Sequence, residues 1–110
     1  MPETDFLVFY DVDSRVRHYH LTVRGKVIEF VLQLEVLMEG KWYPVIRYDT
    51  SHGYAHRDVI HPNGSVSKTP LFVYDYNEAL SFAEGDIKSN WELYKERFLR
   101  EAKRDEEGTI

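Results

Sequence analysis

The feature that most constrains the fold is a regular alternation of apolar and other residues between Lys26 and Met38. Every second side chain from Ile28 to Met38 is apolar, and the positions between them include Glu29 and Glu35. Successive side chains of a β-strand point to opposite faces, so this pattern predicts one long strand with a buried face and a solvated face.

Turn residues connect this strand to a neighbour on each side. Glu39-Gly40 is a two-residue connection of the kind that joins antiparallel strands, and the segment 41–50 after it is rich in aromatic and β-branched residues. On the other side, Gly25 can adopt a positive φ and favours a turn from a strand over residues 15–23. Pro44 cannot donate to a ladder, which predicts an edge, a bulge or a strand start at that position.

Shorter signals extend the sheet in both directions. Asn63-Gly64 is the strongest turn dipeptide of the chain. The further expected strands are residues 5–10, closed by a turn at 11–14, residues 54–61 after Gly53, and a short strand near 71–74. The sequence therefore predicts an antiparallel meander of about five strands.

The last third of the chain changes to a helical period. Asp75 followed by Glu78 is a typical N-terminal cap, because the two carboxylates can accept hydrogen bonds from free backbone amides. Apolar residues then recur at steps of three and four, at Leu80, Ala83, Ile87, Trp91, Tyr94 and Phe98. We predict an α+β fold, a two-layer sandwich in which one long helix covers one face of the sheet.

Composition limits the possible functions. At 110 residues the chain is predicted to be a single domain, 1–110, with a frayed charged tail at 101–110. A formal net charge of -5 argues against bulk attraction to nucleic acid or anionic membranes. The absence of cysteine excludes disulfides and thiolate chemistry. The acidic start and the lack of a long apolar run favour a cytoplasmic protein without membrane contact.

Candidate catalytic residues gather between Tyr48 and Gly64, a segment that holds three of the five histidines. Cleavage of a phosphodiester by its own 2′-hydroxyl needs a base, an acid and a cation, which histidine and arginine can supply. An aspartate beside a histidine can fix its tautomer. The predicted catalytic residues are His56, Arg57, Asp58, His52 and His61, and the predicted substrate-binding residues are Arg47, Tyr48, Asp49 and Tyr54.

A metal site is disfavoured by the same segment. In a regular strand, His52 and His56 would lie about 13 Å apart, too far to bind one ion. Such a site survives only if Gly53 introduces a bulge or turn that brings His52 back towards His56 or Asp58. We therefore predict neither a metal nor another cofactor.

A non-catalytic alternative remains open. Histidine, arginine, aspartate and tyrosine are common on exposed sheet faces, where they serve solubility and cross-strand pairing. A half-apolar meander without a catalytic motif also suits an interaction module that forms a homodimer or binds a protein partner through a strand edge.

A resemblance to known protein families favours the catalytic prediction over the interaction module. The run from "IEFVLQLEV" through "RYDTSHGYAHRDVIHPNG" to "TPLFVYDYNEALSFAEGDIKSNW" resembles a family of short, uncharacterised prokaryotic proteins. More distantly, the layout is similar to the TumE-type toxins of toxin–antitoxin pairs. Tyr48, Asp49, Gly53, His56, Gly64 and Pro70 carry this likeness, although Gly-Tyr-Ala-His-Arg-Asp replaces the toxins' Gly-Lys-Gly-Asp-His-like run. The resemblance implies a ribonuclease-like toxin that acts on RNA, with a cognate antitoxin as partner.

Overall fold

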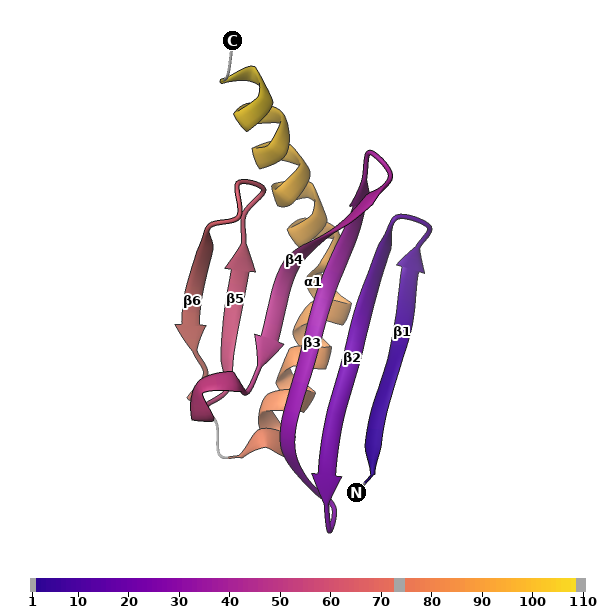
Figure 1. Ribbon diagram of the computed structural model, residues 1–110, viewed down its shortest axis with the longest axis vertical. Helices are drawn as coiled ribbons and strands as arrows, with labels where there is room; N and C mark the ends of the chain where they lie inside the picture. Colours follow the sequence, from indigo (N-terminus) through magenta and orange to yellow (C-terminus); the bar gives the residue numbers. More distant parts are fainter. Residues whose placement is uncertain (1, 73–74, 109–110) are drawn as a thin grey trace.

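The fold is a six-stranded antiparallel sheet with one long helix on one face (Figure 1), and the computed structural model describes residues 2–72 and 75–108. The strands follow one another in space in chain order, which confirms the meander and the α+β class. They are β1 (Glu3–Asp11), β2 (Ser14–Val23), β3 (Lys26–Met38), β4 (Lys41–Asp49), β5 (His56–Ile60) and β6 (Val66–Pro70), followed by the helix α1 (Tyr76–Glu107).

Two tight turns set the register of the central hairpins. Arg24 and Gly25 have φ values of 52° and 78°, and Glu39 and Gly40 have values of 52° and 77°. Positive φ at both central residues matches the right-handed twist of the flanking strands. Pro44 lies next to a register shift between β3 and β4, as predicted, and β5 pairs with β4 only from Ile46 onward.

The core lies between α1 and the sheet. Alternate residues of β3 turn towards the helix, and Phe30, Leu32, Leu34 and Val36 are all buried. From the helix, Ile87 and Phe98 are 1% exposed, and α1 packs on β3 and to a lesser extent on β4. We call the opposite side of the sheet, which faces the viewer in Figure 1, the open face.

The helix begins as its sequence predicts. An oxygen of the Asp75 carboxylate accepts a hydrogen bond of 2.8 Å from the backbone N–H of Glu78. The helix continues to Glu107, so fraying of residues 101–110 stays a prediction, and residues 109–110 lie outside the described part. Among the described residues, no helix combines the length and apolar composition that crossing a bilayer requires.

The two edges of the sheet differ from the expectation. The first strand covers nine residues, because β1 pairs with β2 from Glu3 onward. The last strand is Val66–Pro70 rather than a segment near 71–74, since β6 is the return arm of the Asn63-Gly64 turn. Leu71 and Phe72 lie outside any strand, and residues 73–74 are outside the described part of the chain.

Candidate functional site

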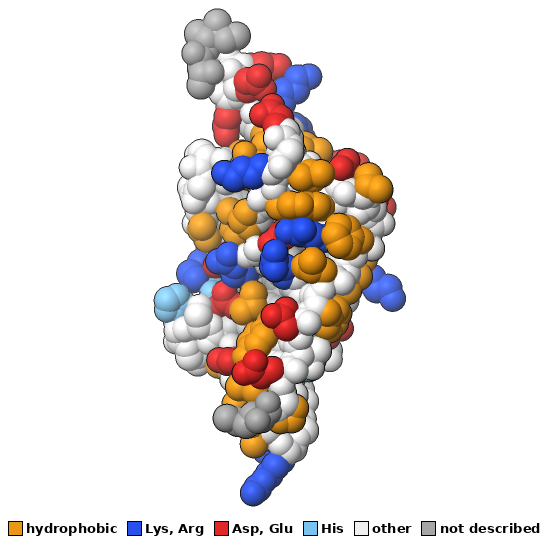
Figure 2. Space-filling model, turned by 45° about the vertical axis from the view of Figure 1, so that its right-hand side comes forward, with side chains coloured by type: hydrophobic (Ala, Val, Ile, Leu, Met, Phe, Trp, Pro, Cys, Tyr) orange, Lys and Arg blue, Asp and Glu red, His pale blue; other side chains and the backbone are white. Residues whose placement is uncertain are grey.

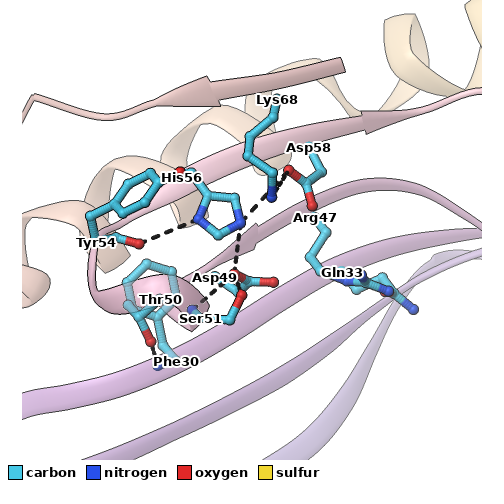
Figure 3. A network of polar contacts seen from close by, with 10 residues as sticks. All are labelled: Phe30, Gln33, Arg47, Asp49, Thr50, Ser51, Tyr54, His56, Asp58 and Lys68. Atoms are coloured by element: carbon cyan, nitrogen blue, oxygen red, sulfur yellow. Dashed lines mark hydrogen bonds and ion pairs between the residues drawn. The ribbon is translucent and has the colours of Figure 1, made fainter. Parts of the chain in front are cut away.

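A polar cluster lies where β4 and β5 pair on the open face (Figure 3). Asp49 is directly opposite His56, and Arg47 is directly opposite Asp58. Opposed residues of an antiparallel pair share a face, and so do residues two apart on one strand. The register therefore gathers all four side chains on one side of the sheet.

His56 is the centre of this cluster, and it is only 1% exposed. Its Nδ1 lies 3.3 Å from the carbonyl oxygen of Tyr54, and its Nε2 lies 2.9 Å from Oδ1 of Asp49. Both oxygens can only accept, so a neutral ring, which has one N–H, can donate to only one of them. In the tautomer with the proton on Nδ1, which donates to Tyr54, the Nε2 lone pair points at the Asp49 carboxylate and is free to bind a cation.

The loop between the strands fixes Asp49. Oδ1 of Asp49 accepts hydrogen bonds from the Ser51 backbone N–H at 3.1 Å and from the Ser51 hydroxyl at 2.9 Å. The next residue, Thr50, accepts a hydrogen bond from the N–H of Phe30 on β3. Ser51–Gly53 then form a single 3₁₀ turn. The carboxylate is thus held in place before the chain turns into β5.

Asp58 is the third member of the cluster and is also buried. Its Oδ1 lies 3.7 Å from Nε2 of His56 and 3.1 Å from Nζ of Lys68 on β6. Neither contact has the geometry of a hydrogen bond, so this buried oxygen accepts none among the described residues. Lys68 is 38% exposed in its side chain and supplies the positive charge nearest to Asp58 on that strand.

One nitrogen and two carboxylate oxygens therefore converge within 4.8 Å of one another. This is a donor set that a divalent cation can use. The sequence did not predict this donor set, because residues 52–58 were expected to form one straight strand. The carboxylate opposite His56 is that of Asp49, which belongs to β4. The signal that could have found it is a turn at Ser51–Gly53, which places Asp49 across from His56.

The structure brings together only part of the predicted catalytic set. His56 and Asp58 share the cluster with Asp49 and Arg47. His52 is exposed, with a φ of 74°, and its ring centroid lies 5.7 Å from that of His56. Tyr54 is 43% exposed and stacks at an angle on His56.

Arg57 does not lie beside His56, because adjacent residues of a strand point to opposite faces. It faces α1, next to Tyr48, Tyr94 and Asp86, whose combined influence outweighs burial and raises the pKa of the Arg57 guanidinium. Tyr48, predicted to bind substrate, is fully buried there and donates a hydrogen bond of 2.7 Å to Asp86.

His61 is also separate from the cluster. Its Nδ1 lies 3.1 Å from Glu101 near the end of α1, and its Nε2 contacts the hydroxyl of Ser67. His56, Arg57 and His61 therefore do not face one common cleft in which they could contact the same phosphate.

Arginine side chains occupy the middle of the open face. Arg15 and Arg17 contact Glu35 at 2.6 and 3.0 Å, and Arg47 donates to the amide oxygen of Gln33. Burial raises the pKa of the Glu35 carboxyl, but hydrogen bonds from Arg15 and Gln33 and the charges of both arginines outweigh it and lower that pKa. Figure 2 shows Lys or Arg side chains next to hydrophobic ones near the middle of the molecule.

The two sheet edges differ in chemistry. On β1, Phe6, Leu7, Val8 and Phe9 are each between 39% and 54% exposed. The other edge, β6, is five residues long, and Lys68 and Pro70 both belong to it. Short length, lysine and proline are the usual means by which an edge strand is protected from pairing with another chain. The β1 edge has none of them.

These features define a small α+β protein with an open antiparallel sheet, a buried polar cluster on one face and an apolar edge strand. A family model described as a domain of unknown function, DUF7718, matches residues 1–104, and the chain belongs to this family. Searches of curated proteins and of solved structures find no match. Prokaryotic origin, the likeness to TumE-type toxins and a cytoplasmic location stay predictions.

Proposed function

We propose that the protein is an interaction module that forms a homodimer through the β1 edge. The observation that carries this proposal is the contrast between the two edges, since β1 is long and apolar whereas β6 is short and carries lysine and proline. An unpaired strand edge offers a row of backbone donors and acceptors to another strand. Pairing of β1 with its own copy would join two sheets into one.

A second copy suits the β1 sequence. Antiparallel pairing centred on Leu7 places Phe6 opposite Val8 of the copy, and pairing centred on Val8 places Leu7 opposite Phe9, as a twofold interface requires. Asp11 would face Glu3 of the copy in the first register and Asp5 in the second. The ammonium of Lys95 lies 3.0 Å from Asp11, which reduces the like-charge repulsion.

The hollow beside β1 adds apolar surface to this interface. It lies between the first two strands and the helix, and its lining includes Phe6, Val8, Tyr10 and Ile87. Side chains of a second sheet that continues past β1 would lie over this hollow and remove it from water.

The test is the mass of the protein in solution, measured by light scattering after gel filtration. We expect a dimer for the wild type and a monomer for Leu7→Lys, because the added charge would lie in the interface. Ile28→Lys is a matched control, since Ile28 is 43% exposed and Leu7 is 42% exposed. A monomeric wild type at about 100 µM, a concentration well above the Kd of a stable dimer, would overturn the proposal.

The second candidate is a ribonuclease-like toxin that acts on RNA and pairs with a cognate antitoxin. Arg15 and Arg17 contact the Glu35 carboxylate, and Arg47 contacts the neighbouring Gln33, so three guanidinium groups and one carboxylate favour a phosphate-bearing ligand on the open face. The burial of His56 weighs against its use as a base. RNA cleavage that is lost in His56→Ala would support this candidate, and cleavage that is unchanged in His56→Ala and Arg57→Ala would eliminate these two residues as catalysts.

A further inference from the structure

Each ring nitrogen of His56 faces an oxygen that can only accept. When Nδ1 donates to the Tyr54 carbonyl, the Nε2 lone pair points at Oδ1 of Asp49, 2.9 Å away, and these two atoms can bind one cation together. A backbone carbonyl that fixes one ring nitrogen is also the usual way in which the other nitrogen is directed at a metal. We propose that Asp49, His56 and Asp58 bind a divalent transition-metal ion such as Zn²⁺ or Mn²⁺.

The distances fit such an ion. In a tetrahedral site with metal–ligand bonds of about 2.1 Å, neighbouring ligand atoms lie about 3.4 Å apart. From Nε2 of His56, Oδ1 of Asp49 is at 2.9 Å and Oδ1 of Asp58 is at 3.7 Å. All three donor atoms lie within 4.8 Å of one another, so small side-chain movements would close the site.

Burial and charge favour the ion as well. Asp58 has a side chain that is 9% exposed, and its Oδ1 faces the cluster without a hydrogen bond. Two buried carboxylates beside one imidazole need compensating charge. Lys68 provides part of it, but its side chain is 38% exposed and can turn into water. The ion would bind Nε2 in the tautomer whose proton lies on Nδ1, and it would displace the Lys68 ammonium from Asp58.

The donor set indicates the class of metal. A nitrogen ligand with two carboxylates suits zinc or manganese, whereas magnesium and calcium prefer oxygen ligands alone. Three protein ligands leave a further coordination position, for water or for the exposed ring of His52. The residues of the site lie on β4 and β5, three and four strand spacings from β1, which is about 14 to 19 Å. The site therefore does not depend on the proposed dimer.

Calorimetric titration of the full chain with ZnCl₂ tests the proposal, with MgCl₂ as the comparison salt. We expect one zinc ion per chain and much weaker magnesium binding. Asp58→Asn should weaken zinc binding by about 10-fold or more, because even groups that only hydrogen-bond to a metal ligand have effects of about 10- to 100-fold. Lys68→Gln should tighten zinc binding, because it removes the competing ammonium.

Glu101→Gln is the matched control. It removes the carboxylate of the other histidine–carboxylate pair, His61 and Glu101, which lies outside the cluster. Zinc affinity should be unchanged in this variant. The thermal midpoint of each variant without metal reports whether it is folded.

Two results would overturn the proposal. One is the absence of zinc binding at about 1 mM, the weak limit of specific affinity, in both the wild type and the folded Lys68→Gln variant. The other is zinc binding that Asp58→Asn leaves unchanged while Glu101→Gln reduces it. The opposite effects expected for Asp58→Asn and Lys68→Gln distinguish a metal site from a merely structural ion pair.

Discussion

At the scale of residues, Asp86 joins the helix to the sheet. It accepts hydrogen bonds from the hydroxyls of Tyr48 at 2.7 Å and Tyr94 at 2.6 Å, and from the amide of Asn90 at 2.8 Å. Burial, and then the hydrogen bond to Asp86, raises the pKa of Tyr48 and raises that of Tyr94 to about 12. These phenols must stay neutral for the network to persist.

This network predicts a loss of stability at high pH. The folded pKa of Tyr94 exceeds its unfolded value of about 10, so its contribution is complete below about pH 10 and is lost as the pH rises towards about 12. We expect the urea midpoint of the wild type to fall between pH 9 and pH 11, and that of Tyr94→Phe to fall less. Tyr54→Phe, at an exposed tyrosine, is the control, and equal slopes for wild type and Tyr94→Phe would contradict the prediction.

At the scale of elements, the apolar stripe of α1 attaches the helix to β3 and β4. Ile87 is 1% exposed in this layer, whereas Leu93 on the same helix is 63% exposed. Ile87→Ala should lower the free energy of unfolding by about 3 kcal/mol, because it removes buried methyl groups and leaves a cavity. Leu93→Ala should change it by less than about 0.5 kcal/mol. Urea denaturation measures both values, and similar losses would argue against the packing described.

Two glycines provide a second comparison of elements. Gly40 has a φ of 77° in the β3–β4 turn, whereas Gly85 lies inside α1 with nothing within 4 Å of an added Cβ. Gly40→Ala should destabilise the protein by about 1 kcal/mol, since alanine is strained at this φ. Gly85→Ala should stabilise it by a similar amount, about 1 kcal/mol, through helix propensity. Thermal midpoints that move in the same direction would contradict this pair of predictions.

The elements also show which features the sequence could predict. The alternation in β3, the Asn63-Gly64 turn and the Asp75 cap are local patterns, and the structure confirms them. The cluster around His56 is not local, because it depends on the pairing of β4 with β5. The expectation of one regular strand over residues 52–58 places His56 and Asp58 on one face. It could not place Asp49 opposite them, nor show that Arg57 faces Tyr94.

At the scale of the whole molecule, the shape is elongated because α1 extends beyond one end of the sheet (Figure 1). The extents are 54, 27 and 22 Å, and α1 has no buried residue after Phe98. We expect amides of residues 103–107 to exchange with deuterium faster than those of the first half of α1 and of β3, because local opening there exposes little apolar surface. Mass spectrometry after timed exchange measures this, and uniform protection along α1 would contradict it.

The chain-order arrangement of the strands has a consequence for synthesis. Each hairpin can close as soon as its second strand has left the ribosome, but the helix that covers Phe30 and Leu34 is made after all six strands. A nascent chain that stops before α1 therefore exposes the apolar face of the sheet to water. A fragment ending at residue 75 should bind the dye ANS much more strongly than the full chain, and equal fluorescence would refute this view.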